Sequence, residues 1–143
     1  MQDKKRRAAI NAHIKNDAFT RFLGAEVTIV APGHSRASLT VTEHMTNFHG
    51  TTHGGLVFAL GDLAFAAASN SRGQVAVALN VTIYFLNPSK VGDRLVAEAK
   101  ECHPGGRTGL YEITVVEETT GTVIARSQDL VYRKKQWFIA PED

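Results

Sequence analysis

The chain has 143 residues, of which 43% are hydrophobic and 21% charged, and its formal net charge is +2. These values fit one soluble globular domain spanning residues 1–143. The small net charge, without a basic stripe that carries interleaved aromatics, argues against nucleic-acid binding. The single cysteine, Cys102, excludes an internal disulfide and a cysteine metal cluster within one chain. The charged N-terminus is not a secretory signal, so we expect a cytoplasmic protein.

Residues 3–22 predict helical structure. Apolar side chains recur every four positions from Ile10 to Phe22, which puts them in one stripe on a helix. Asn16 or Asp17 can cap a second short helical piece. Gly24 is a plausible stop signal, so we expect the helical segment to end there.

A hairpin, a loop and a buried helix are expected next. Residues 25–42 alternate between apolar and polar on both sides of Pro32-Gly33, the pattern of a β-hairpin. Residues 43–52 have no clear period and predict a loop. From residue 56 to 68 every residue is apolar or glycine except Asp62. This run is rich in Ala and Leu and too short to cross a bilayer, so it predicts a helix buried on all sides.

The second half predicts a meander of four strands, over residues 75–86, 94–102, 108–117 and 123–132. Residues 75–85 show unbroken alternation with few polar groups on either face, so we expect both faces to be covered. The tail from Lys134 is mixed and is expected to fray, although Trp137 and Phe138 are apolar enough to dock on something.

Together these elements predict an α+β fold. We expect a curved antiparallel sheet of about six strands wrapped round one long buried helix, with another helix at the N-terminus. No repeat or second domain is visible. The apolar strand 75–86 needs cover that one chain does not supply, and a second copy of the chain is the simplest cover. We therefore expect a symmetric oligomer.

Asp62 is the first candidate functional residue. A carboxylate inside an apolar helix is costly unless it is paired or useful. One interpretation is structural, with Asp62 paired across the core to Arg72 or Arg94. The other is catalytic, with Asp62 as nucleophile or general base.

The start of the same helix is the second candidate. The N–H groups of Gly54 and Gly55, with the helix dipole behind them, can hold a carbonyl oxygen, although a Gly-Gly pair can also be only a tight turn. Gly54 and Asp62 are eight residues apart, about 12 Å along a helix. One chain cannot readily bring both to one carbonyl carbon, but two antiparallel helices about a two-fold axis can. This predicts an active site shared between subunits.

The loop before the helix holds polar candidates. Asn47 can orient a water or a carbonyl, or it can simply close the loop. His53 can orient substrate at the helix start or act only as a cap. His44, His49 and His53 follow no metal-binding spacing and have no cysteine partners, so we expect no metal site.

A glycine-rich turn is the last candidate. Gly105-Gly106-Arg107-Thr108 combines flexible backbone, a cation and a hydroxyl, which can bind phosphate. Further cations that can lie near it are Lys90, Arg133, Lys134 and Lys135. Most such turns are only turns, and the pattern alone is weak.

These residues together resemble the hotdog-fold acyl-CoA thioesterases, and most closely the phenylacetic acid degradation thioesterases. The resemblance begins with Asn47, the run His53-Gly54-Gly55, and Asp62 nine residues after His53. Further matching stretches are Asn16-Asp17-Ala18, Leu23-Gly24, Phe65-Ala66, Ser69-Asn70-Ser71, Thr82-Ile83, Phe85-Leu86, Thr108-Gly109 and Tyr111. The resemblance covers about residues 10 to 133.

The resemblance implies roles for the site residues. Asp62 would be the catalytic carboxylate, Gly54 or Gly55 would polarise the thioester carbonyl, and His53 and Asn47 would support the site. Asp62 would come from one subunit and the other groups from its partner, in a tetramer built of two dimers. Coenzyme A enters as part of the substrate, and no separate cofactor is implied.

The substrate contacts are less well defined. Coenzyme A would lie along the subunit boundary, its phosphates near basic residues such as Arg107 or Lys90. Some relatives carry a Ser or Thr opposite the carboxylate; here Asn80 is the nearest polar substitute. The acyl pocket would be lined by aromatic residues such as Phe48, Phe58 and Tyr84.

The leading hypothesis is therefore hydrolysis of phenylacetyl-CoA or a ring-hydroxylated form, in aromatic catabolism. Two alternatives remain. One is a hydratase or dehydratase acting on acyl thioesters, which needs a histidine and an acid together near the β-carbon. The other is a non-catalytic module that binds acyl-CoA.

Overall fold

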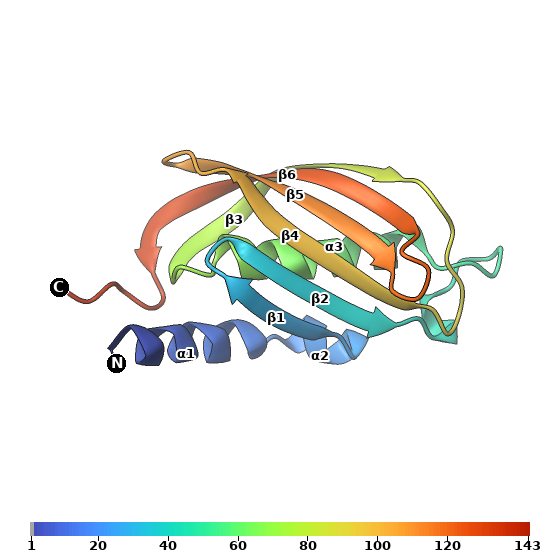
Figure 1. Cartoon of the computed structure of the whole chain (residues 1–143), viewed down its shortest axis with the longest axis horizontal. Coiled ribbons are helices and arrows are strands. Elements are labelled where there is room, and N and C mark those ends of the chain that lie inside the picture. Colours follow the sequence, from blue (N-terminus) through green and yellow to red (C-terminus); the bar gives the residue numbers. More distant parts are fainter. Residues whose placement is uncertain (1) are drawn as a thin grey trace.

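The computed structural model describes residues 2–143, which form one curved antiparallel sheet around a central helix (Figure 1). The helical elements are α1 (Gln2–Lys15), α2 (Ala18–Leu23), the single 3₁₀ turn η1 (Glu43–Met45) and α3 (Gly54–Ser69). The strands are β1 (Glu26–Ala31), β2 (His34–Thr40), β3 (Gln74–Phe85), β4 (Arg94–His103), β5 (Thr108–Glu117) and β6 (Val123–Trp137). Their order across the sheet is β1-β2-β4-β5-β6-β3, with every neighbouring pair antiparallel. The predicted α+β architecture is confirmed, but the predicted meander of four strands is wrong. Only β4, β5 and β6 pair in chain order, and β3 lies at the sheet edge on the far side of β6.

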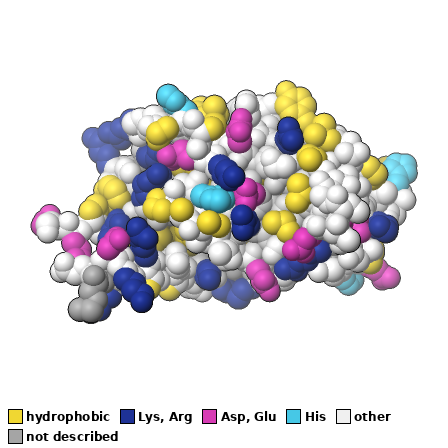
Figure 2. All heavy atoms as spheres, viewed as in Figure 1, with side chains coloured by type: hydrophobic (Ala, Val, Ile, Leu, Met, Phe, Trp, Pro, Cys, Tyr) yellow, Lys and Arg dark blue, Asp and Glu magenta, His cyan; other side chains and the backbone are white. Residues whose placement is uncertain are grey.

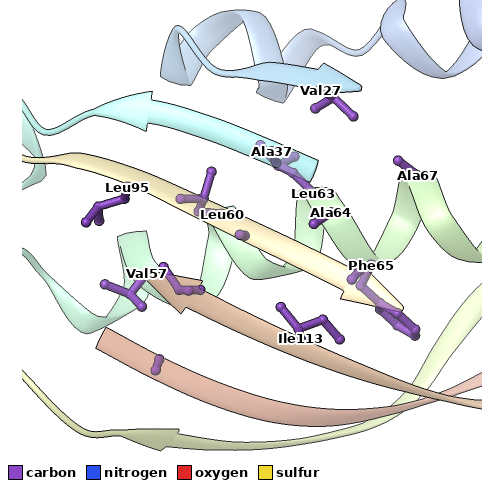
Figure 3. Packing of buried hydrophobic residues seen from close by; sticks show 14 of the residues in the cluster. Val27, Ala37, Val57, Leu60, Leu63, Ala64, Phe65, Ala67, Leu95 and Ile113 are labelled. Carbon is purple, nitrogen blue, oxygen red and sulfur yellow. The ribbon is translucent and has the colours of Figure 1, made fainter. Parts of the chain in front are cut away.

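The hydrophobic core lies between α3 and the concave face of the sheet. Figure 3 shows Leu60 and Ala64 of α3 among the strands, close to Leu95 and Ile113, and all four are at most 2% exposed. Small alanine side chains let the helix approach the sheet closely. The Ser35 hydroxyl, fully buried on β2, donates a hydrogen bond to the Ala64 carbonyl (2.5 Å). Packing and this hydrogen bond therefore hold α3 against the sheet. The prediction that the helix is buried on all sides is wrong for one chain, because Phe58 is 39% exposed and Ala66 is also exposed.

The N-terminal segment folds into two helices, as its pattern predicts. Asp17 caps α2, its carboxylate accepting hydrogen bonds from the Thr20 backbone N–H (3.0 Å) and hydroxyl (2.6 Å). Gly24 ends α2 in the left-handed region at φ 65°, which glycine adopts without strain. Both helices lie along the β1 side of the molecule in Figure 1.

The C-terminal tail is ordered against α1, and the predicted end of the last strand at residue 132 is wrong. β6 continues to Trp137, which pairs with Gln74 of β3. The Phe138 ring stacks on His13 of α1 at 4.6 Å between centroids. Residues that look frayed in sequence are therefore held by strand pairing and by the N-terminal helix.

β3 is an edge strand, paired only with β6 among the described residues. The unbroken alternation predicted for it is wrong, because the register shifts between Ala78 and Asn80. Such a bulge inserts an extra residue and changes which side chains face the helix. Leu79, Tyr84 and Phe85 are 55–62% exposed. The strand expected to be covered on both faces is thus uncovered within one chain.

The outer face of the sheet is charged and mixed in sign, as Figure 2 shows. Glu98 of β4 lies there between Arg36 (2.5 Å) and Lys100 (3.1 Å). The hydrogen bond from Arg36 is the main reason that the pKa of Glu98 falls to about 2. Within residues 2–143, no helix has the length and apolar character needed to span a membrane.

Candidate active site

Asp62 lies in the middle of α3, half-buried and without a cation. Burial raises the pKa of its carboxyl group, and no hydrogen bond or ion pair within the described chain offsets this. The structural alternative is not realised, because Arg72 pairs with Glu101 (3.0 Å) and Arg94 approaches Glu26 (3.6 Å). A buried carboxylate left unpaired by its own chain is typical of a functional position.

Asp62 borders a large hollow between α3 and the N-terminal helices, which we call the N-terminal hollow. Its volume is about 450 Å³. Phe19 of α2, Leu63 of α3, Asn70 directly after α3, and Phe138 contribute to its walls. This space can accept a bound group next to the carboxylate.

The start of α3 is capped by His53. Its Nδ1 atom accepts a hydrogen bond from the Gly55 N–H at 2.8 Å. The Gly55 donor is therefore already used, whereas the Gly54 N–H has no acceptor among the described residues. Of the two predicted oxyanion donors, only Gly54 is free to bind a ligand. The sequence could not distinguish them, because the choice depends on the rotamer of His53.

Gly54 borders a different hollow from Asp62. It has a volume of about 290 Å³ and is lined by Val57, Phe85, Pro88 and other residues at the β3 end. α3 runs without interruption between Gly54 and Asp62, which separates them by about 12 Å. The two groups therefore do not meet in one chain, as the helix arithmetic predicts.

The side chain of Asn47 closes its own loop. Its Oδ1 accepts hydrogen bonds from the N–H groups of His49 (2.9 Å) and Thr51 (3.2 Å), and its Nδ2 donates to the Thr51 hydroxyl (3.0 Å). Phe48, at the tip of this loop, is 94% exposed and contacts the His49 ring. Among residues 2–143 no group of three or more His, Cys, Asp or Glu is arranged to hold a metal.

The remaining predicted substrate residues are dispersed. Phe58 lies one turn before Asp62 on α3. Both residues border a small cavity of about 10 Å³ between α3 and the sheet. Asn80 pairs with Leu130 and Val81 with Asp129, so Asn80 lies on the face of β3 turned away from Asp62. Tyr84 lies four residues after Asn80 on the same strand, and because side chains alternate between faces it shares that outer face. One chain does not bring Asn80 or Tyr84 to Asp62.

The two predicted phosphate-binding cations are far apart. Lys90 precedes β4 and pairs with Asp93 (3.1 Å), while Arg107 is exposed after the end of the same strand. Ten residues of β4 separate them, about 30 Å of extended chain. One coenzyme A cannot use both from a single chain at the same phosphate.

Arg133 organises the glycine-rich turn. Its Nη1 donates to the carbonyls of Gly105 (2.7 Å) and Thr108 (2.9 Å), and its Nη2 to Glu101 (3.0 Å). A Cβ atom on Gly109 would come within 2.5 Å of this guanidinium, which explains the glycine. The turn is thus a structural unit built round Arg133.

Asp129 is a buried carboxylate near Asp62 that was not predicted from the sequence. It lies on β6 and faces α3, is only 2% exposed, and borders the same small cavity as Asp62. A signal was present, because Asp129 continues the inward-facing series of Ala125, Ser127 and Val131. A carboxylate at an inward position of a strand is as unusual as one inside an apolar helix.

Comparison with known proteins identifies the family. A model of the thioesterase superfamily matches residues 49–124, which include the start of α3 and Asp62. The chain belongs to the thioesterase superfamily. Its fold is the hotdog fold of this superfamily, with the sheet wrapped round α3.

Several relatives of this thioesterase superfamily member are similar over most of their length. Acyl-coenzyme A thioesterase PaaI of Escherichia coli is 44% identical over 115 residues, covering 79% of this chain and 82% of the relative. The structure of E. coli PaaI, a protein from the phenylacetic acid degradation operon, superimposes with a TM-score of 0.87 at 36% identity, covering 93% and 96%. Human acyl-coenzyme A thioesterase 13 is 32% identical, covering 85% and 89%. A Streptococcus mutans protein solved with acetyl CoA has a TM-score of 0.73 at 26% identity, covering 77% and 88%.

Proposed function

We propose that this chain hydrolyses acyl-CoA thioesters, with phenylacetyl-CoA or a ring-hydroxylated form as its preferred substrate in aromatic catabolism. The observation that carries the proposal is the unpaired Asp62 carboxylate on a helix whose first N–H, at Gly54, is free. An acid and an oxyanion donor are the two groups that thioester hydrolysis needs. The similarity to PaaI of E. coli supports the choice of substrate.

The proposed active site is shared between two chains. Two copies with antiparallel α3 helices would bring Asp62 of one chain close to Gly54 of the partner subunit. The exposed apolar edge of β3 supports such a dimer, since Leu79 and Phe85 are 55% exposed on a strand that pairs with β6 on one side only. We further propose a tetramer of two such dimers and a cytoplasmic location.

The proposed reaction uses the residues of both chains. Gly54 of the partner subunit donates its N–H to the thioester oxygen, where negative charge develops. Asp62 either attacks the carbonyl carbon, giving an anhydride that water opens, or removes a proton from the attacking water. In both routes the carbon–sulfur bond breaks and the coenzyme A thiolate takes up a proton. No metal or separate cofactor takes part.

The proposed substrate contacts follow the same dimer. Phe58, one turn from Asp62, would contact the acyl group, with the exposed Phe48 and Tyr84 joining from the chains' shared boundary. His53 would hold the helix start in shape, and Asn47 the loop before it. Lys90 and Arg107 would bind coenzyme A phosphates from different subunits. Asn80 would contact the substrate only from the partner subunit, because it faces away from Asp62 of its own chain.

Measuring free thiol release across a panel of acyl-CoAs tests the proposal. Wild type should release thiol from phenylacetyl-CoA, and Asp62→Asn should do so at least about 10²-fold more slowly. Full activity of Asp62→Asn contradicts the proposal. Tight acyl-CoA binding without turnover by wild type indicates a binding module instead, and addition of water to an enoyl-CoA without thiol release indicates a hydratase.

A further inference from the structure

We propose that Asp129 is a positioning residue for Asp62: it borders the same small cavity from β6, and its charge controls the reactivity of the Asp62 carboxylate. The inference rests on the proposed catalytic role of Asp62 and concerns how that group is kept ready to react.

The geometry places the two carboxyl groups at one cavity. Asp62 from α3 and Asp129 from β6 both border a space of about 10 Å³ between the helix and the sheet. The other walls are largely apolar and include Val81, Ile83, Ile113, Val115 and Ala125. A space of this size holds a single water at most. No acyl group can enter it, so Asp129 acts on the reaction only through Asp62.

Asp129 is only partly satisfied by its own chain, where burial raises its pKa and a side-chain hydrogen bond with Ser127 opposes that shift. It is 2% exposed, and its Oδ1 atom makes no hydrogen bond within residues 2–143. Buried polar atoms in native proteins are nearly always satisfied, so an orphaned carboxylate oxygen needs an explanation. The one ionisable group that faces it across the cavity from another element is Asp62.

The other charged and titratable neighbours are occupied or turned outward. Tyr111, opposite Asp129 on β5, donates its hydroxyl to Glu101 at 2.6 Å. Glu101 in turn pairs with Arg133 (3.0 Å) and Arg72. Arg126 borders the cavity but is exposed, and β3 contributes only apolar side chains there.

Two carboxyl groups beside one dry cavity cannot both ionise freely. Burial raises the pKa of Asp129 to about 6, and the charge of Asp62 adds to this shift. The pair therefore titrates as a unit, each negative charge opposing the other. The negative charge of Asp129 makes the Asp62 carboxylate more basic, which favours its action as nucleophile or base.

The test is the acidic limb of the pH profile of kcat/KM, followed between pH 4 and pH 8 by loss of thioester absorbance. Asp129→Asn removes the charge but keeps the shape. We expect its profile to lose the component near pH 6, because no ionisation of Asp129 then adds to the reactivity of the Asp62 carboxylate. Asp129→Glu should restore part of the wild-type profile. Ile113→Val alters packing at the same cavity without a charge, and its limb should stay at the wild-type pH.

A second measurement does not require activity. Carbon-13 NMR titration should give an Asp129 pKa that is lower in Asp62→Asn than in wild type. If both the limb of Asp129→Asn and this titration match wild type, the inference is overturned. If Asp62→Asn keeps full thioesterase activity while the titration shifts, the proposed function fails and the coupling between the two carboxyl groups stands.

Discussion

At the scale of single residues, the site is defined by which polar groups are already used within the chain. Arg72 and Arg94 pair with other acids, so Asp62 is left without a cation. Gly55 donates to His53, so Gly54 is the free N–H. Asp129 is buried without a hydrogen bond to Oδ1. A buried carboxyl group with an unsatisfied oxygen lowers the free energy of unfolding, and this effect can be measured.

Replacing Asp129 with Asn should stabilise the protein above pH 6. The folded pKa of about 6 lies above the ordinary value of 3.8, so the native state binds the proton more tightly than the unfolded chain. The protonated form is favourable at low pH, and this advantage is lost as pH rises from about 4 to about 6. We expect the difference in unfolding free energy between Asp129→Asn and wild type to grow by about 2 kcal/mol, in favour of the variant, from pH 4 to pH 8.

Urea unfolding at pH 4 and pH 8 measures this difference, because comparison of the two proteins cancels the titrating groups that do not interact with Asp129. Glu98, whose pKa is lowered to about 2, acts in the opposite direction and is common to both chains. An unchanged difference at pH 4 and pH 8 would show that Asp129 is not destabilised by burial.

At the scale of elements, α3 carries the cap, the proposed oxyanion donor and the proposed acid at fixed positions along one helix. His53 is extended at ψ 134° and accepts from Gly55, which starts the helix and leaves Gly54 at its first position. Sixteen residues of Ala- and Leu-rich sequence then carry the helix past Asp62 to Ser69. The helix thus fixes both the distance and the relative orientation of the two reactive groups.

Loss of the His53 cap should weaken α3 at the end that carries the donor. His53→Ala leaves the Gly55 N–H without its partner, and we expect a loss of about 1 kcal/mol. His53→Asn supplies another capping side chain and should recover most of that loss. Thermal unfolding of the two variants measures the difference, and equal melting temperatures for wild type and His53→Ala would contradict the capping role.

At the scale of the whole molecule, one chain keeps the proposed donor and the proposed acid apart. Gly54 and Asp62 border separate hollows, and the apolar edge of β3 is left open. A two-fold dimer would cover the edge and complete both sites in the same step. The bulge between Ala78 and Asn80 alters the strand that such a dimer would use.

Mixing two inactive variants tests the shared site. Asp62→Asn removes the acid, and Gly54→Pro removes the donor at a first helical position where proline is tolerated. Each should be inactive alone. Random mixed dimers carry one intact site in half of the molecules, so about a quarter of wild-type activity should return. The control is Gly54→Ala, which keeps the N–H and brings its Cβ no closer than 3.5 Å to Phe85. If the mixture stays inactive, the site is not shared.

The sequence by itself determined the order of elements, the buried helix and the separation of Gly54 from Asp62, because periodicity and helix rise are local properties. It also carried the family resemblance that the comparisons confirm. Only the tertiary structure decided that Asn47 closes its loop, that Gly55 is capped, and that β6 runs on to Trp137. It alone brought Asp129 to the small cavity that Asp62 borders. These outcomes depend on rotamers and strand register, which contacts distant in sequence select.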